Sequence, residues 1–159
     1  MKKILFPTKF ADCESEVFKF ASELAYFLKA ELLVMYTFGK PEYALTSKEL
    51  IEEWTGLVNE TLIAFVEGNL LKDYRDDILV GYIAKIGYPV ESILQIAKEK
   101  DVDIIVMGIS GKDKINDNLL GQTCLDVLAK ADCPVLAIPE TIKFEGIEHS
   151  MSNLYANVL

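Results

Sequence analysis

Histidine and paired cysteines are scarce in this chain. Among its 159 residues there is one histidine, His149, and there are three cysteines, Cys13, Cys124 and Cys133, without paired spacing. A metal site built from clustered histidine and cysteine is therefore not indicated, and each cysteine is interpreted as a small buried hydrophobic residue. The usual Ser–His and Cys–His pairs of nucleophilic catalysis would all depend on His149. We therefore expect a protein that is not an enzyme, with slow nucleotide hydrolysis left open.

The chain also has few positively charged residues and no long apolar runs. The 16 Lys and Arg residues face 25 Asp and Glu residues, which gives a formal net charge of −9. Such an acidic field opposes binding to nucleic acid or to anionic lipid, but a local anion site built from backbone N–H groups stays compatible with it. No apolar run approaches the ~20 residues that span a bilayer, and no secretory segment is recognisable. We expect a cytoplasmic protein that contacts neither nucleic acid nor membrane.

The hydrophobic residues, 51 % of the chain, fall into alternating strand-like and helix-like segments. Five apolar runs predict strands covered on both faces: 3–7, 31–38, 78–86, 103–108 and 133–139. Four segments with apolar residues at helical spacing separate them: 17–28, 46–69, 90–100 and 118–131. This order predicts a single α/β domain with a parallel sheet, helices on both of its faces and right-handed crossovers. In such sheets, ligands bind beyond the carboxyl ends of the strands.

Several polar segments have local structural interpretations. The sequence TSKE, Thr46 to Glu49, has the spacing of a capping box at the start of the second helix, in which Trp54 is expected to be a core or interface residue. Acidic residues near position 14 suit the first helix start, with Asp12 as its cap. The carboxylates at 73, 76 and 77 are interpreted as a solvated turn, with a cation site as the alternative.

The sequence MGISGKDKINDNLLGQT follows the fourth strand and carries three glycines, Gly108, Gly111 and Gly121. Glycine permits close backbone approach to a ligand, and a loop that leads into a helix start offers free N–H groups to a phosphate. Lys112 and Lys114 add positive charge. The alternative is that the first two glycines serve only a sharp turn. The loop lacks both G-x-G-x-x-G and G-x-x-x-x-G-K-[ST].

Over about residues 1–140, the chain resembles the universal stress protein (UspA) family, as a single-domain member. The resemblance rests on ILFPTKF, ELLVMYTF, IGYPVESILQIAKEKDVDIIVMGISG and LLGQTCLDVLAKADCPVLAIP. It also rests on the G-x2-G-x9-G spacing of the three glycines, which ATP-binding members of the family share. The resemblance implies a stress-response protein with a doubly wound, Rossmann-like sheet of five parallel strands in the order 3-2-1-4-5.

The family's nucleotide pocket can be carried over by position, with two departures. The residues concerned are Pro7, Thr8, Lys9, Thr37, Met107, Gly108, Gly111, Gly121, Gln122 and Thr123. The family usually has Ser or Thr where Gln122 stands, and Asp where Lys9 stands. If the site is live, Lys9 points toward the phosphates of an ATP, which Mg²⁺ accompanies when it is bound. If the site is a relic, Lys9 or Gln122 occupies the cavity and pairs with protein groups.

Two functional hypotheses follow from the resemblance. In the first, the protein binds ATP and acts through its dimer or through protein partners that the sequence does not identify. In the second, it is a dimeric interaction module of the same family that binds no nucleotide. The family commonly pairs through its last strand, so we expect a homodimer through residues 134–139, with residues 143–147 as a further contact. The tail, 141–159, is expected to form an extra edge strand or a dimer contact.

Overall fold

The computed structural model describes residues 1–11, 14–39, 47–109, 122–141 and 143–147. Its centre is a parallel sheet with the strand order β3-β2-β1-β4-β5. The strands are β1 (Lys3–Pro7), β2 (Glu31–Phe38), β3 (Val80–Ile86), β4 (Ile104–Ile109) and β5 (Val135–Pro139). All four neighbouring pairs are parallel. The fold class and the strand order implied by the resemblance are therefore confirmed.

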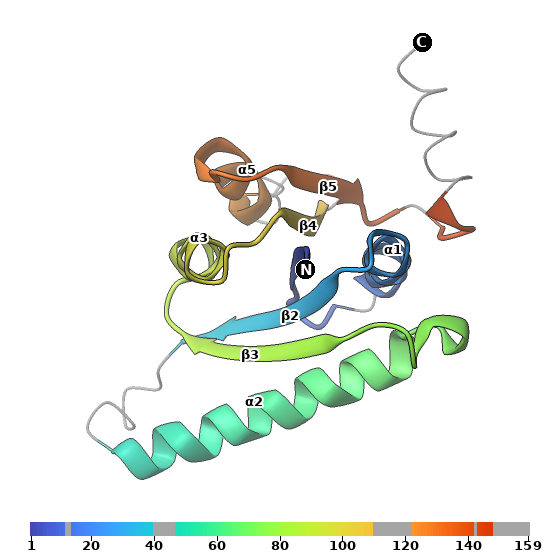
Figure 1. Cartoon of the computed structure of the whole chain (residues 1–159). Coiled ribbons are helices and arrows are strands. Elements are labelled where there is room, and N and C mark those ends of the chain that lie inside the picture. Colours follow the sequence, from blue (N-terminus) through green and yellow to red (C-terminus); the bar gives the residue numbers. More distant parts are fainter. Residues whose placement is uncertain (12–13, 40–46, 110–121, 142, 148–159) are drawn as a thin grey trace.

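Helices cover both faces of the sheet (Figure 1). They are α1 (Glu14–Leu28), α2 (Lys48–Asn69), α3 (Pro89–Glu99) and α5 (Gln122–Lys130), with a short 3₁₀ helix, η2 (Lys72–Tyr74), between α2 and β3. Helices α1 and α2 pack on one face and α3 and α5 on the other. None of the helices in the described part of the chain has the length and apolarity needed to cross a membrane.

The core consists of two apolar layers separated by the central strands. In β1, Ile4 and Phe6 point into the layer under α1 and α2, whereas Leu5 points into the layer under α3 and α5. All three are fully buried, because side chains alternate between the faces of a strand that is covered on both sides. This burial fixes the position of the carboxyl end of β1, where Pro7 stands, in the centre of the sheet.

The start of α2 differs from the sequence-based expectation. Its N-cap is Ser47, whose side chain accepts a hydrogen bond from the Leu50 N–H at 3.3 Å. The capping box that starts at Thr46 was therefore wrong by one residue. A serine and a threonine stand side by side here, and sequence alone does not tell which of them leaves the helical conformation first. Helix α2 ends at Asn69, as expected.

The buried face of α2 leaves Trp54 outside the core. Val58, Leu62 and Val66 are the buried residues of this helix, whereas Trp54 and Leu57 are 37 % and 52 % exposed. Trp54 is thus not a core residue. The expected interface role for Trp54 stays a prediction.

The segment that follows β5 returns along α1. The Phe144 N–H donates to Glu16 Oε2 at 2.6 Å, and the Ile147 N–H donates to Glu23 Oε2 at 2.6 Å. None of residues 143–147 lies in a strand, and the backbone donors of Phe144 and Ile147 are used by carboxylates of a helix. The expected extra edge strand is therefore not formed by these residues, and residues 148–159 lie outside the described part.

Candidate functional site

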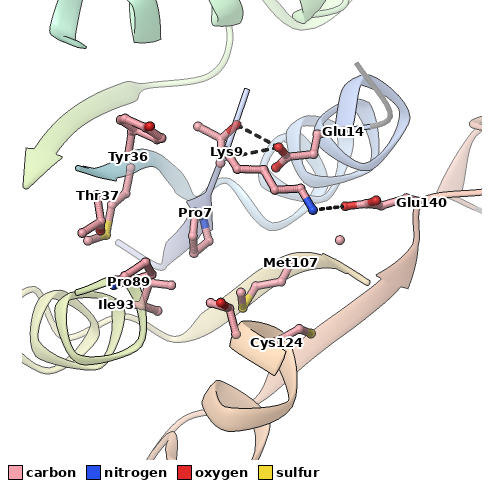
Figure 2. Close-up of a pocket in the computed structure, with 14 residues that line it drawn as sticks. Pro7, Lys9, Glu14, Tyr36, Thr37, Pro89, Ile93, Met107, Cys124 and Glu140 are labelled. Atoms are coloured by element: carbon pink, nitrogen blue, oxygen red, sulfur yellow. Dashed lines mark hydrogen bonds and ion pairs between the residues drawn. The ribbon is translucent and has the colours of Figure 1, made fainter. Parts of the chain in front are cut away.

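A cavity of about 150 Å³ lies at the carboxyl ends of β1, β2 and β4 (Figure 2). The chain winds from β1 to β2 on one side and reaches β4 on the other, so the cavity is at the switch point of the sheet, where α/β proteins bind ligands. Its lining comes from the ends of β1, β2, β4 and β5 and from the first turns of α1, α3 and α5. The lining residues are Pro7, Thr8, Lys9, Glu14, Met35, Tyr36, Thr37, Pro89, Ile93, Met107, Gly108, Thr123, Cys124 and Glu140.

The structure brings most of the sequence-predicted site residues together. The following line the cavity: Pro7, Thr8, Lys9, Thr37, Met107, Gly108 and Thr123. Gly111 and Gly121 lie outside the described residues, as do Lys112 and Lys114. Gln122 is exposed at the first position of α5, where its Nε2 donates to Asp126 Oδ1 at 2.7 Å. Gln122 does not line the cavity, so it does not fill the site.

Glu14 organises the loop between β1 and α1. Its Oε1 accepts the N–H groups of Lys9 and Ala11 at 2.9 and 3.1 Å, and it lies 3.4 Å from the Thr8 hydroxyl, which donates to it. Phe10 between them has a φ of 60°, which is uncommon for a bulky residue. The two N–H bonds to one carboxylate help to hold this turn. Sequence reasoning assigned Glu14 only to the helix start and missed its role in the site.

The carboxylate of Glu14 is buried beside the cavity. Burial raises its pKa above the usual value of a glutamate, and the hydrogen bonds from Lys9 and Ala11 and the charge of Lys9 only partly offset this effect. The charge of Glu140 raises the pKa slightly further. The cavity therefore contains a carboxylate whose ionisation is disfavoured by its surroundings.

Lys9 forms an ion pair with Glu140 beside the cavity (Figure 2). The distance from Lys9 Nζ to Glu140 Oε1 is 3.2 Å, with the lysine side chain 48 % exposed and the glutamate side chain 7 % exposed. Glu140 directly follows β5, so it stands at the carboxyl edge of the sheet. That position was the sequence signal that could have identified it, and sequence reasoning missed it. Lys9 pairs with a protein group, as the relic hypothesis predicts.

Gly108 leaves the space that Glu140 uses. A Cβ at Gly108 would lie 2.9 Å from both Cγ and Oε1 of Glu140. The glutamate side chain thus packs directly on the glycine backbone at the end of β4. The close approach that sequence reasoning assigned to a phosphate is made in this structure by a carboxylate of the chain itself.

The remaining lining combines apolar walls with hydroxyl groups. Met35, Ile93 and Met107 are buried and apolar, and Thr37 and Thr123 add two hydroxyls. A concave apolar surface with a few polar groups is typical of small-molecule sites.

Neither described cysteine has the character of a nucleophile. Cys124 at the cavity is buried, and this burial, together with the charge of Glu140, raises its thiol pKa. Burial also raises the pKa of the half-buried Cys133. Both are neutral thiols at neutral pH. Cys124 is the small buried residue that was expected, Cys133 is only partly buried, and Cys13 lies outside the described residues. Across the described residues, no three His, Cys, Asp or Glu side chains are placed to hold a metal ion.

Comparison with known proteins gives a consistent result. The family model described as "Universal stress protein family" matches residues 1–139. The universal stress protein MJ0531 of Methanocaldococcus jannaschii is 30% identical over 146 residues, which cover 89% of this chain and 84% of that protein.

Two solved structures share the fold at lower identity. A universal stress protein in complex with cAMP has a TM-score of 0.65 at 16% identity, covering 88% of this chain and 98% of its own. The universal stress protein of Archaeoglobus fulgidus in complex with dAMP has a TM-score of 0.59 at 21% identity, covering 87% and 97%. The family match, the strand order and the relative from M. jannaschii together show that this chain belongs to the universal stress protein family.

Proposed function

We propose that this protein is a stress-response module that binds an adenine nucleotide in the cavity at the ends of β1, β2 and β4. The observation that carries the proposal is the convergence of sequence-predicted residues. Thr8, Thr37, Gly108 and Thr123 come from four separate segments and line one cavity at the switch point. The cAMP and dAMP complexes of two proteins with this fold support the choice of an adenine nucleotide.

The described residues suit different parts of such a ligand. The buried apolar side chains of Met35 and Ile93 fit an aromatic base, because a base is flat and uncharged and can pack against apolar walls. The hydroxyls of Thr37 and Thr123 offer donors and acceptors to ribose. The spacing of Gly108, Gly111 and Gly121 is the sequence argument for a phosphate cradle, and Mg²⁺ would accompany the nucleotide only when ATP is bound.

The bound nucleotide would act as a signal and not as a substrate. Among the described residues, the cavity lining has hydroxyls and carboxylates but no histidine, and its cysteine has a raised pKa. The function that we propose is therefore recognition: nucleotide occupancy changes the dimer or the contacts with protein partners. Turnover of ATP forms no part of the proposal.

A second candidate function has a specific observation in its favour. The ion pair between Lys9 and Glu140 satisfies the one cation of the described lining without any ligand. Under this alternative, the protein is a dimeric interaction module that binds no nucleotide, and the ion pair replaces the ligand in joining β1 to the end of β5.

Calorimetric titration separates the two candidates. Adenosine, AMP and ATP with Mg²⁺ would each be titrated into the purified protein and into Gly108→Val, whose side chain projects against Glu140 at the cavity. Gly39→Val is the matched control, because a Cβ at Gly39 meets none of the described atoms within 4 Å and Gly39 does not belong to the described lining. We expect saturable binding in the parent and in Gly39→Val, and its loss in Gly108→Val. Absence of binding by all three ligands in the parent would favour the second candidate.

A further inference from the structure

We infer that Glu140 is a resident anion of the cavity that determines the ligand class: it disfavours nucleotides in proportion to their phosphate charge and leaves neutral adenosine unaffected. This inference rests on the proposed function, because it concerns the selectivity of the same site. The feature that carries it is the placement of the Glu140 carboxylate between Lys9 and Gly108, against the very glycine that the sequence assigns to phosphate.

Several contacts define the placement of Glu140. Its backbone N–H donates to Ile109 O at 3.0 Å, which ties the residue to the end of β4. Its carboxylate lies 3.2 Å from Lys9 Nζ, and its side chain covers Gly108 at a distance that leaves no space for a Cβ. The side chain is thus held over the cavity from both sides while it is almost completely removed from solvent.

The charges of the described lining do not favour an anion. Lys9 contributes one positive charge and Glu140 one negative charge, and Glu14 adds a second negative charge only when it is ionised, which its burial disfavours. Lys9 is already neutralised by Glu140. A phosphate group that approaches this lining therefore meets the Glu140 carboxylate beside a lysine whose charge is already paired, and repulsion between like charges is strong where little water screens it.

Two kinds of ligand respond differently to this arrangement. Adenosine carries no charge, so it can pack against the apolar walls of the cavity without disturbing the ion pair between Lys9 and Glu140. A nucleotide must either tolerate the Glu140 charge or displace the carboxylate from Lys9, and each course lowers its affinity. The penalty rises with the number of phosphate charges, so it is greater for ATP than for AMP.

The test is a titration of ATP, AMP and adenosine into the parent and into Glu140→Gln, which keeps the size of the side chain and removes its charge. Glu52→Gln on α2 is the matched control, because Glu52 is exposed and does not belong to the cavity lining. In Glu140→Gln, we expect the ratio of the ATP to the adenosine dissociation constant to fall about tenfold, and the corresponding AMP ratio to fall less. Glu52→Gln should leave both ratios unchanged.

A second variant tests the part played by Lys9. In Lys9→Met, Glu140 loses its ion pair with Lys9, so the ratio of the ATP to the adenosine dissociation constant should rise severalfold instead of falling. In the double variant Lys9→Met/Glu140→Gln the two effects should not add, because the two side chains are in direct contact. Melting temperatures identify any variant that is not folded under the conditions of the titration.

The outcomes distinguish this inference from the proposed function. Adenosine binding together with a ratio that Glu140→Gln leaves unchanged would overturn the inference and leave the proposed function in place. Absence of binding by all three ligands in the parent and in every variant would overturn the proposed function, and the inference with it. A lower ratio in both Glu140→Gln and Glu52→Gln would assign the effect to the net charge of the protein and overturn the specific role of Glu140.

Discussion

Glu14 shows how one buried carboxylate can organise a loop at a cost in stability. It accepts two backbone N–H groups and a hydroxyl of the β1–α1 loop, yet burial raises its pKa above the usual value. A raised pKa in the folded state means that ionisation destabilises the fold. The stability that its protonated form contributes is complete below the unfolded pKa and is lost as the pH rises through the folded pKa.

This sign gives a prediction for Glu14→Gln. The amide oxygen can still accept the N–H groups of Lys9 and Ala11, and the variant has no charge to desolvate. Relative to the parent, the free energy of unfolding of the variant should therefore improve as the pH rises from about 4 to about 7. Urea unfolding at several pH values measures the difference. A difference that is independent of pH would show that ionisation of Glu14 is not linked to folding.

At the scale of single elements, the start of α2 depends on one side chain. The Ser47 Oγ accepts the Leu50 N–H, which satisfies one of the backbone donors that a helix start leaves without an intrahelical partner. Ser47→Ala should lower the free energy of unfolding by about 1 kcal/mol. Thr46→Ala is the control, because the capping-box hypothesis assigns the same role to Thr46. A loss at Thr46 and none at Ser47 in thermal unfolding would restore that hypothesis.

The segment after β5 is attached through α1 and η2. Glu23 is buried on α1. Its Oε2 accepts the Ile147 N–H, and its Oε1 accepts the Tyr74 hydroxyl at 2.9 Å. The hydrogen bond to Glu23 is also the main reason why the pKa of Tyr74 is raised. One carboxylate thus joins η2, α1 and the residues that follow the sheet.

Removing the Tyr74 hydroxyl tests this junction. Tyr74→Phe takes one donor from a buried carboxylate, so it should cost about 2 kcal/mol of the free energy of unfolding. Tyr88→Phe is the matched control, because Tyr88 is largely exposed and should change stability little. Both variants can be compared by urea unfolding. Equal effects of the two substitutions would contradict the role assigned to the hydrogen bond with Glu23.

At the scale of the whole molecule, β5 ends the sheet of the described residues on one side. The Pro134 carbonyl accepts the Ile105 N–H, and the Glu140 N–H donates to Ile109 O. Because backbone groups alternate in direction along a strand, the N–H groups of Val135 and Ala137 point away from β4. Universal stress proteins commonly form homodimers, and edge strands with unused backbone groups invite pairing. Pairing through β5 is therefore our prediction for this chain.

Ala137→Pro tests the predicted dimer. Proline removes the N–H that points away from β4 and leaves the groups of the β4–β5 ladder in place. We expect a dimer in the parent and a folded monomer in this variant, measured by light scattering at micromolar concentration. Ala137→Val, which keeps the N–H group, should remain a dimer. A parent that is monomeric would contradict the prediction.

Local patterns along the chain determined the elements and their order. Continuous apolar runs located the five strands, because a strand buried on both faces needs apolar side chains on both. Strict alternation with helices then required a parallel sheet. The family resemblance added the strand order and directed attention to Pro7, Thr37 and Gly108 at the strand ends, all of which line the cavity. The capping residue and the buried face of α2 were not determined in this way, since neighbouring residues offer nearly equal local solutions.

Only the tertiary structure decided what the site contains. Glu140 is 131 positions from Lys9 along the chain, and no local pattern indicates that the two side chains meet. They meet because β1 and β5 flank β4 in the sheet and both strands end at the same edge. Glu14 and Glu23 likewise look like ordinary helix carboxylates in the sequence until folding places backbone donors beside them, from the adjacent loop at Glu14 and from the distant Ile147 at Glu23. Periodicity and propensity act over a few residues, so the sequence by itself determined the helices, the strands and the layers that they form. Contacts between charged side chains at the ends of different strands depended on how those layers pack.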